Sequence, residues 1–79
     1  MQWVAVDSTT IAQIGYDSSK RELGIEFRQT GKVYVYFDVP PEEHEAFMAA
    51  ESKGTYLNTV FKLKEYRYTI VKRGQKPAV

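Results

Sequence analysis

The chain contains no cysteine, which excludes disulfide bonds, thiolate nucleophiles and zinc sites built on thiolates. A single histidine would have to serve any acid–base site alone. No apolar run approaches the ~20 residues that span a bilayer. The N-terminus has neither the basic region nor the apolar core of a signal peptide. We therefore expect a cytoplasmic protein that does not act on membranes and uses no metal or other cofactor.

The net charge of +1 conceals an uneven distribution along the 79 residues, which suffice for one small domain. Residues 1–51 carry four basic and nine acidic side chains, a net charge of −5. Residues 52–79 carry seven basic side chains and one acidic, a net charge of +6. A basic C-terminal third on an acidic body indicates an anionic partner.

Three antiparallel strands joined by tight turns are predicted over residues 11–16, 22–28 and 32–39, where β-favouring residues and alternation coincide. Two-residue loops at 18–19 and 30–31 would place Ile14 opposite Leu23. The same loops would place Phe27 opposite Tyr34 and Ile25 opposite Tyr36. Both hairpins then share one core face, and the two tyrosines lie on it.

Two helices are expected to follow the strands and to pack on one face of the sheet. The prolines and glutamates of residues 40–43 suit the first turn of a helix. The second helix is predicted over about residues 55–64, with Ser52 as its N-cap and an apolar stripe that includes Leu57 and Phe61.

The stretch from Val33 to Phe37 is apolar on both faces, and a three-stranded meander would leave it at an exposed edge. Residues 66–71, residues 3–7 or a second copy of the chain can cover that edge, and we favour a strand from one terminus. The prediction is thus one α+β domain over residues 1–71. It has a three-stranded meander, two helices and a possible extra terminal strand, followed by a disordered basic tail at 72–79.

An ordered set of short motifs runs from Val6 to about Tyr66. Its residues are Val6, Ser8, Ile11, Ile14, Gly15, Tyr16, Asp17, Leu23, Ile25, Phe27, Gly31, Tyr34, Val35, Tyr36, Val39, Pro40, Ala50, Ser52, Gly54, Leu57, Asn58, Phe61 and Lys62. Together they resemble the KTSC domain, a module at the C-terminus of some lysyl-tRNA synthetases that also occurs as a stand-alone bacterial protein. The resemblance implies no established activity, and its synthetase context implies RNA binding.

The two central motifs of this resemblance allow both a structural and a binding interpretation. Tyr34 and Tyr36 can stack on bases or can lie in the core, and the predicted register favours the core. Ser52, Gly54 and Asn58 can hold a phosphate or a carboxylate. They can equally have structural roles, with Ser52 as a helix cap, Gly54 in a tight bend and Asn58 as a hydrogen-bond partner for a loop backbone group. We favour the structural interpretation.

Residues 42–45 gather three carboxylates and the only imidazole. Consecutive helical positions point in different directions, so these groups cannot converge on one metal ion. We also expect no enzyme activity. Glu43 and His44 stand where the KTSC family usually has an apolar residue followed by an aromatic one, and Leu57 stands where phenylalanine is typical. His44 is therefore expected to be a partly buried substitute for an aromatic ring.

The basic C-terminal third provides the principal functional hypothesis, binding of RNA or another single-stranded nucleic acid. Its cations and interleaved tyrosines would contact phosphates and bases. The candidate residues are Lys53, Lys62, Lys64, Tyr66, Arg67, Tyr68, Lys72 and Arg73. Two alternatives are a solvated basic surface and a segment that docks onto the acidic body. A further alternative is a protein-binding or homodimeric module that uses the edge from Val33 to Phe37.

Overall fold

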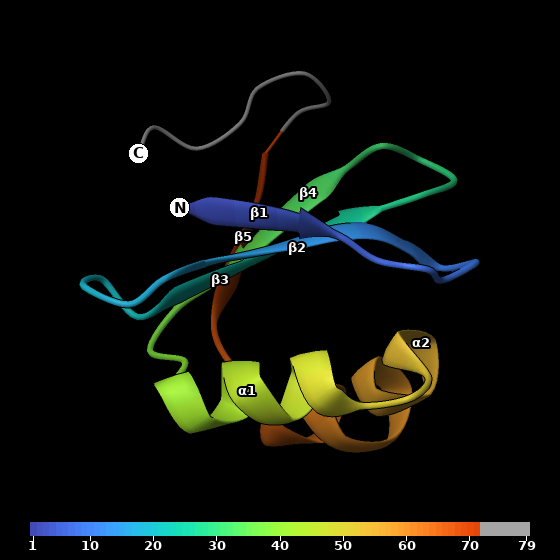
Figure 1. The fold of residues 1–79 in the computed structure, drawn as a ribbon. Coiled ribbons are helices and arrows are strands. Elements are labelled where there is room, and N and C mark those ends of the chain that lie inside the picture. The colour runs from blue at the N-terminus through green and yellow to red at the C-terminus, as the bar shows by residue number, and fades with distance from the viewer. Residues whose placement is uncertain (72–79) are drawn as a thin grey trace.

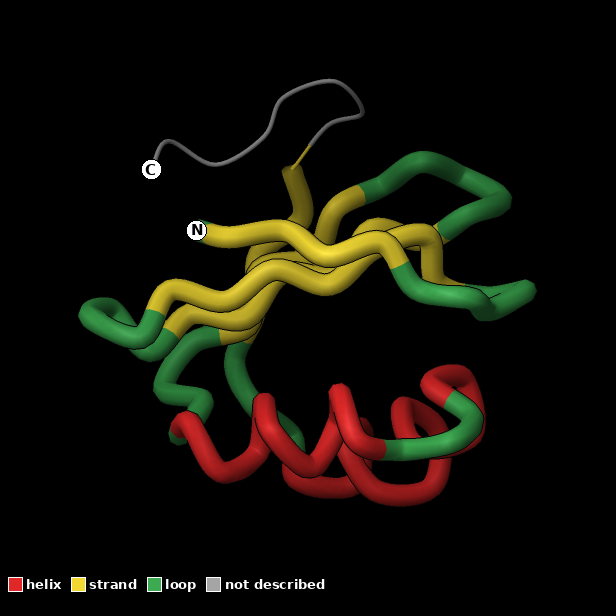
Figure 2. Tube along the Cα trace, in the orientation of Figure 1, coloured by secondary structure: helices red, strands yellow, loops and turns green. Residues whose placement is uncertain are grey.

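The computed structural model describes residues 1–71 and contains one antiparallel sheet of five strands with helices on one face (Figures 1 and 2). The strands, in both chain and sheet order, are β1 (Gln2–Ala5), β2 (Ile11–Asp17), β3 (Glu22–Phe27), β4 (Val33–Tyr36) and β5 (Tyr68–Val71). Between β4 and β5 lie α1 (Pro41–Ala49), α2 (Lys53–Tyr56), the π-helical η1 (Leu57–Phe61) and the 3₁₀-helical η2 (Lys62–Lys64). The predicted α+β class is confirmed, but the sheet has five strands.

The hairpin registers differ from the prediction by two residues, while the predicted core face is confirmed. Ile14 pairs with Ile25, and Ile25 pairs with Tyr34. Leu23 pairs with Tyr16 on one side and with Tyr36 on the other. Side chains alternate between faces with a period of two, so a two-residue shift changes the partner but leaves each side chain on the same face.

The shift arises because both hairpins turn over more than two residues. In the first loop, the Asp17 carboxylate accepts hydrogen bonds from the backbone of Ser19 and Lys20, and Arg21 adopts a φ of 55°. In the second loop, Gly31 has a φ of 71°, a left-handed conformation that glycine adopts without steric cost. These local hydrogen bonds and left-handed residues stabilise longer turns than the sequence pattern indicated.

Strand β5 covers the edge that the sequence left open. Val33 pairs with Val71 and Tyr36 pairs with Tyr68, so β4 has a partner strand on each side. The expected terminal strand is therefore present, and β1 adds a second one beside β2. The self-association alternative assumed that the edge from Val33 to Phe37 is open. That assumption is wrong, because β5 pairs with β4 along this edge.

The main core lies between the sheet and the helices. Ser52 is confirmed as an N-cap, because its hydroxyl oxygen accepts a hydrogen bond from the amide of Thr55. The second helical segment begins at Lys53, two residues before the predicted start, and it changes from α- to π- and then 3₁₀-helical geometry. The buried core cluster consists of Ile11, Ile14, Tyr16, Leu23, Ile25, Tyr36, Val39, Phe47, Leu57 and Phe61.

Trp3 lies on the opposite face of the sheet, directly over two glycines. A Cβ atom built on Gly15 would lie 2.7 Å from Trp3 Cδ2, and one built on Gly24 would lie 2.5 Å from Trp3 Cη2. These glycines therefore allow the indole to lie against the backbone of β2 and β3. Val33 and Val35 are buried on this same face, which gives the sheet a second, smaller apolar layer.

Replacing Gly24 with valine is expected to lower the free energy of unfolding by about 2 kcal/mol, because the new side chain would overlap the indole of Trp3. Urea denaturation measures the loss. The same substitution in a Trp3→Ala background is the control, and there valine should cost less because the overlap is gone. An equal cost in both backgrounds would contradict the proposed contact.

Candidate functional site

An open groove lies between the helices and the side of the sheet formed by β3, β4 and β5. We call it the aromatic groove and define it by Phe27, Tyr34, Tyr36, Lys62 and Tyr68. It consists of two adjoining cavities, about 470 and 610 Å³ in volume, that share Tyr34, Tyr36 and Lys62. Each cavity falls in the size range of ligand-binding pockets.

The rings of the aromatic groove contact one another while leaving apolar surface open. Tyr34 lies between Phe27, with ring centroids 5.0 Å apart, and Tyr68, with centroids 5.4 Å apart. Tyr36 is buried, Tyr34 is partly buried and Tyr68 is 55% exposed. The core interpretation is therefore confirmed for Tyr36, whereas Tyr34 lies at the border between core and groove.

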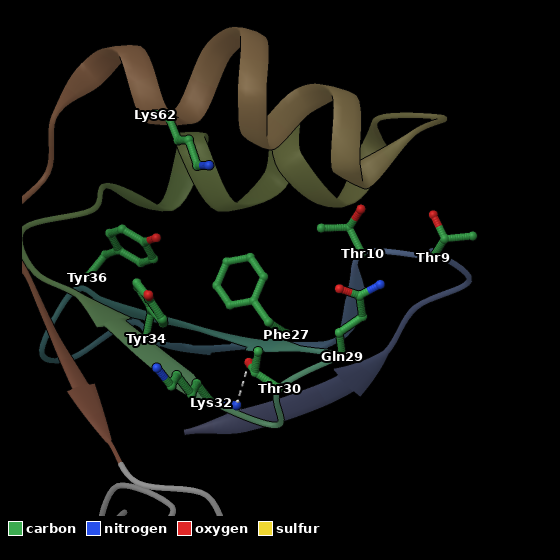
Figure 3. Close-up of a pocket in the computed structure, with 9 residues that line it drawn as sticks. All are labelled: Thr9, Thr10, Phe27, Gln29, Thr30, Lys32, Tyr34, Tyr36 and Lys62. Atoms are coloured by element: carbon green, nitrogen blue, oxygen red, sulfur yellow. Dashed lines mark hydrogen bonds between the residues drawn. The ribbon is translucent and has the colours of Figure 1, made fainter.

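Two lysines lie beside these rings. Lys62 follows the buried Phe61, and its side chain extends from the helical layer into the cavity above Tyr36 and Phe27 (Figure 3). Lys32 lines the same cavity from the turn before β4. Neither ammonium group takes part in an ion pair within residues 1–71. The groove thus combines an apolar aromatic floor with two cations available to an anion.

The other three predicted basic residues within residues 1–71 each contact a partner in the protein itself. The ammonium of Lys53 donates a hydrogen bond of 2.5 Å to the carbonyl of Ala50. Lys64 pairs with Glu43 at 2.6 Å, and Arg67 pairs with Asp38 at 3.0 Å. Contact of these three residues with nucleic acid stays a prediction, and each of them already has a partner within the protein. The candidates Lys72 and Arg73 lie outside the described residues.

Glu43 is a buried carboxylate at the centre of a hydrogen-bond network. It is 4% exposed and accepts hydrogen bonds from the hydroxyls of Tyr56 and Tyr66 as well as from Lys64. Tyr66, predicted to contact nucleic acid, is therefore used to bind Glu43. This network joins α1 to the second helical segment and to the residues before β5, and it explains why an acid occupies a core position.

The network changes the acidity of its members. Burial raises the pKa of Glu43, but the hydrogen bonds from Lys64, Tyr56 and Tyr66 outweigh burial and bring the pKa below its ordinary value of 4.5. Burial and the hydrogen bond to Glu43 raise the pKa of both tyrosine hydroxyls to about 12. At neutral pH the Glu43 carboxylate is therefore ionised, and both tyrosine hydroxyls are neutral donors.

The acidic stretch at residues 42–45 does not converge on one point. Glu43 faces inward, whereas Glu42 and Glu45 are exposed. His44 stacks on Tyr16, with ring centroids 4.5 Å apart and planes at 8°, which confirms its role as a substitute aromatic ring. Burial lowers the pKa of His44 and favours its neutral form. Within residues 1–71, no group of three or more metal-ligating side chains is close enough to bind one ion.

A second depression, which we call the polar cleft, lies between the β1–β2 loop and the start of α2. It has a volume of about 390 Å³ and includes Ser52, Gly54 and Asn58. A Cβ atom on Gly54 would lie 3.2 Å from Thr10 Oγ1, so glycine allows the helix to approach the loop closely. Asn58 is exposed, and its side chain has no hydrogen-bond partner within residues 1–71. Its predicted bond to a loop backbone group is not seen.

Sequence reasoning missed the contributions of Phe27, Gln29 and Lys32 to the aromatic groove. The alternation of residues 22–28 did place Phe27 on the core face, but it could not show that an open cavity lies between this ring and the helices. Lys32, Tyr34 and Tyr36 are spaced by two residues, so their side chains point to the same face of a strand. This spacing was the sequence signal that could have placed Lys32 beside the two tyrosines. Lys32 was not considered because it lies outside the basic C-terminal third of the chain.

No helix in the described part of the chain has the length and apolar character required to cross a membrane.

Comparisons with known proteins give consistent results. The family model described as the KTSC domain matches residues 7–71. An uncharacterised protein of Stutzerimonas stutzeri is 41% identical over 68 residues, covering 86% of this chain and 94% of the relative. A lysine–tRNA ligase of Nostoc punctiforme is 40% identical over 58 residues, which are 73% of this chain and 10% of the ligase. The crystal structure of a KTSC domain protein from Yersinia pestis is similar with a TM-score of 0.81 and 38% identity, covering 89% of this chain and 96% of that one.

Proposed function

Given that this chain belongs to the KTSC domain family, we propose that it is a non-catalytic module that binds single-stranded RNA in the aromatic groove. The observation that carries the proposal is the position of Lys62 and Lys32 beside the accessible surfaces of Phe27, Tyr34 and Tyr68. A related segment also forms about a tenth of a lysine–tRNA ligase, a protein whose name states that it acts on tRNA. A cytoplasmic location is part of this proposal.

The chemistry of the groove suits unpaired nucleotides better than other anions. Every base has a flat aromatic face that can stack on Tyr68 or Tyr34, and such a stack contributes about 1–3 kcal/mol per base. A lysine can bind the phosphate between two stacked bases. A small inorganic anion would gain the contact with Lys62 but none of the contacts with the rings. A paired duplex would keep its bases away from those rings.

The proposal assigns the binding to fewer cations than the sequence indicated. Lys64 is paired with the buried Glu43, and Arg67 forms an exposed ion pair with Asp38. Neither residue lines the aromatic groove, so the proposal assigns phosphate binding to Lys62 and Lys32. Two phosphate contacts predict a shallow salt dependence. The slope of log K against log salt should be about −1.4, at about −0.7 for each phosphate neutralised on a single strand.

Replacing Lys62 with glutamate is expected to weaken binding of a labelled single-stranded RNA octamer at least tenfold, because a cation becomes a repelling anion. It should also reduce the slope on salt by about 0.7. Fluorescence anisotropy at several salt concentrations measures both quantities. Tyr68→Ser removes one stacking ring and should weaken binding about fivefold or more, with the salt slope unchanged.

Lys20→Glu is the matched control for charge. Lys20 is exposed in the β2–β3 loop, outside the residues that line the groove, and the substitution changes the net charge by the same amount as Lys62→Glu. It should leave the affinity within about twofold of the wild type. Equal losses from Lys20→Glu and Lys62→Glu would show that only overall charge matters. Absence of RNA binding by the wild type at micromolar protein would refute the proposal.

A further inference from the structure

The aromatic groove and the polar cleft form one continuous surface. Thr9 and Thr10 line both the polar cleft and the nearer cavity of the aromatic groove. Figure 3 places these threonines beside Gln29, at the opposite end of that cavity from Tyr36. The three depressions therefore follow one another along the side of the molecule, from β5 past the turn before β4 to the β1–β2 loop.

The polar cleft differs chemically from the groove that it extends. Its lining includes the carboxylates of Asp7 and Glu51, and its only cation, Lys53, donates a hydrogen bond to Ala50. A phosphate would therefore be repelled here. The cleft presents neutral hydrogen-bonding groups instead, namely the hydroxyls of the threonines and the amide of Asn58.

Asn58 is the side chain best placed to select a ligand in this cleft. Its amide offers two donors and two acceptor positions, and none is used within residues 1–71. The Ser52 hydroxyl, by contrast, donates to Thr55 Oγ1 and accepts from the Thr55 amide. The absence of a side chain at Gly54 allows the two walls of the cleft to lie close together at Thr10.

We propose that the polar cleft is a second subsite of the same groove, where Asn58 hydrogen-bonds the base edge or the ribose of the nucleotide next to the stacked ones. The inference rests on the proposed function and extends it, because stacking alone binds all bases similarly. Phosphates would lie at Lys62 and Lys32, and the neutral part of the following nucleotide would lie in the cleft. The cleft would give this module its preference among RNA sequences or between RNA and DNA.

Anisotropy titrations with labelled hexamers of rA, rC, rU, dA and dC test this inference. We expect the wild type to bind the best hexamer threefold to tenfold more tightly than the weakest, which is the range that one or two hydrogen bonds provide. Differences among rA, rC and rU would identify the base edge as the recognised group. A difference between rA and dA, and equally between rC and dC, would identify the ribose.

Asn58→Ala should reduce the ratio between the highest and the lowest hexamer affinity to less than twofold. The slope of log K against log salt should stay unchanged, because no phosphate contact is lost. Thr59→Ala is the matched control, since Thr59 is the next residue in the chain and does not line the cleft. The thermal midpoints of both variants verify that they fold. Equal affinity of the wild type for all five hexamers, or an unchanged range in Asn58→Ala, would overturn the subsite but leave RNA binding intact. Failure to bind any hexamer would overturn both.

Discussion

Replacing Tyr36 with serine is expected to lower the free energy of unfolding by about 3–5 kcal/mol, the cost of deleting a buried aromatic ring. Tyr36 packs edge-on against Phe61, with ring centroids 4.8 Å apart, and lies 5.5 Å from the ring of Tyr68. Burial and the neighbouring Tyr34 and Tyr68 also raise the pKa of its hydroxyl to about 12. Serine would leave a cavity where the sheet meets the second helical segment.

The loss is large relative to the total stability of a domain of this size, which is about 4–12 kcal/mol. Urea denaturation followed by circular dichroism measures it. Tyr36→Phe keeps the ring and should cost less than about 1.5 kcal/mol. Tyr68→Ser truncates a tyrosine that is 55% exposed and should also have a small effect on stability. If Tyr36→Ser and Tyr68→Ser unfold at the same urea concentration, the different burial of the two rings is contradicted.

Replacing Glu43 with alanine is expected to lower the free energy of unfolding by about 2–3 kcal/mol at pH 7, because Tyr56, Tyr66 and Lys64 would lose their shared acceptor. Lys64 is half-exposed and regains water, so the two partly buried hydroxyls account for most of the cost. Glu43→Gln keeps an acceptor without the charge and should have an intermediate effect.

The difference in free energy of unfolding between the wild type and Glu43→Ala should become smaller as the pH falls. Folding lowers the pKa of Glu43 below 4.5, so the ionised carboxylate stabilises the folded state fully above about pH 5.5. This contribution is lost as the pH falls through the folded-state pKa, and the two proteins should then become closer in stability. Denaturant titrations between pH 3 and pH 7 measure this. A difference that grows on acidification would contradict the ionised network.

The sequence predicted the faces of the central strands correctly because alternation depends only on parity. Leu23 and Ile25 lie on the same side of the sheet as Tyr34 whenever the turn between the last paired residues of the two strands contains an even number of residues, so the two-residue error in register did not change the face. The register was wrong because a turn motif fixes loop length through local hydrogen bonds, such as those accepted by Asp17, that strand alternation does not encode. The short strand β1 was considered only as a partner for β4.

The candidate site was predicted less well than the fold, because counting charges along the chain does not show which charges are already paired. Lys62 and Lys64 are equivalent in a charge count, yet one borders a groove and the other neutralises a buried acid. Glu43 was recognised as unusual, but its two tyrosine partners lie 13 and 23 residues away. Only the packing of α1 against the second helical segment brings these groups together.

The indole of Trp3 lies over Gly15 and Gly24, on the face of the sheet opposite the aromatic groove. It is the only tryptophan in the chain, so fluorescence excited at the red edge of protein absorption comes from one known place. We expect that emission to change when β1 leaves the sheet, and we expect a ligand bound among the tyrosines, on the other face, to change it little. The tryptophan and the tyrosines of the groove therefore lie on opposite sides of one sheet, where they can serve as separate optical probes of folding and of the proposed binding.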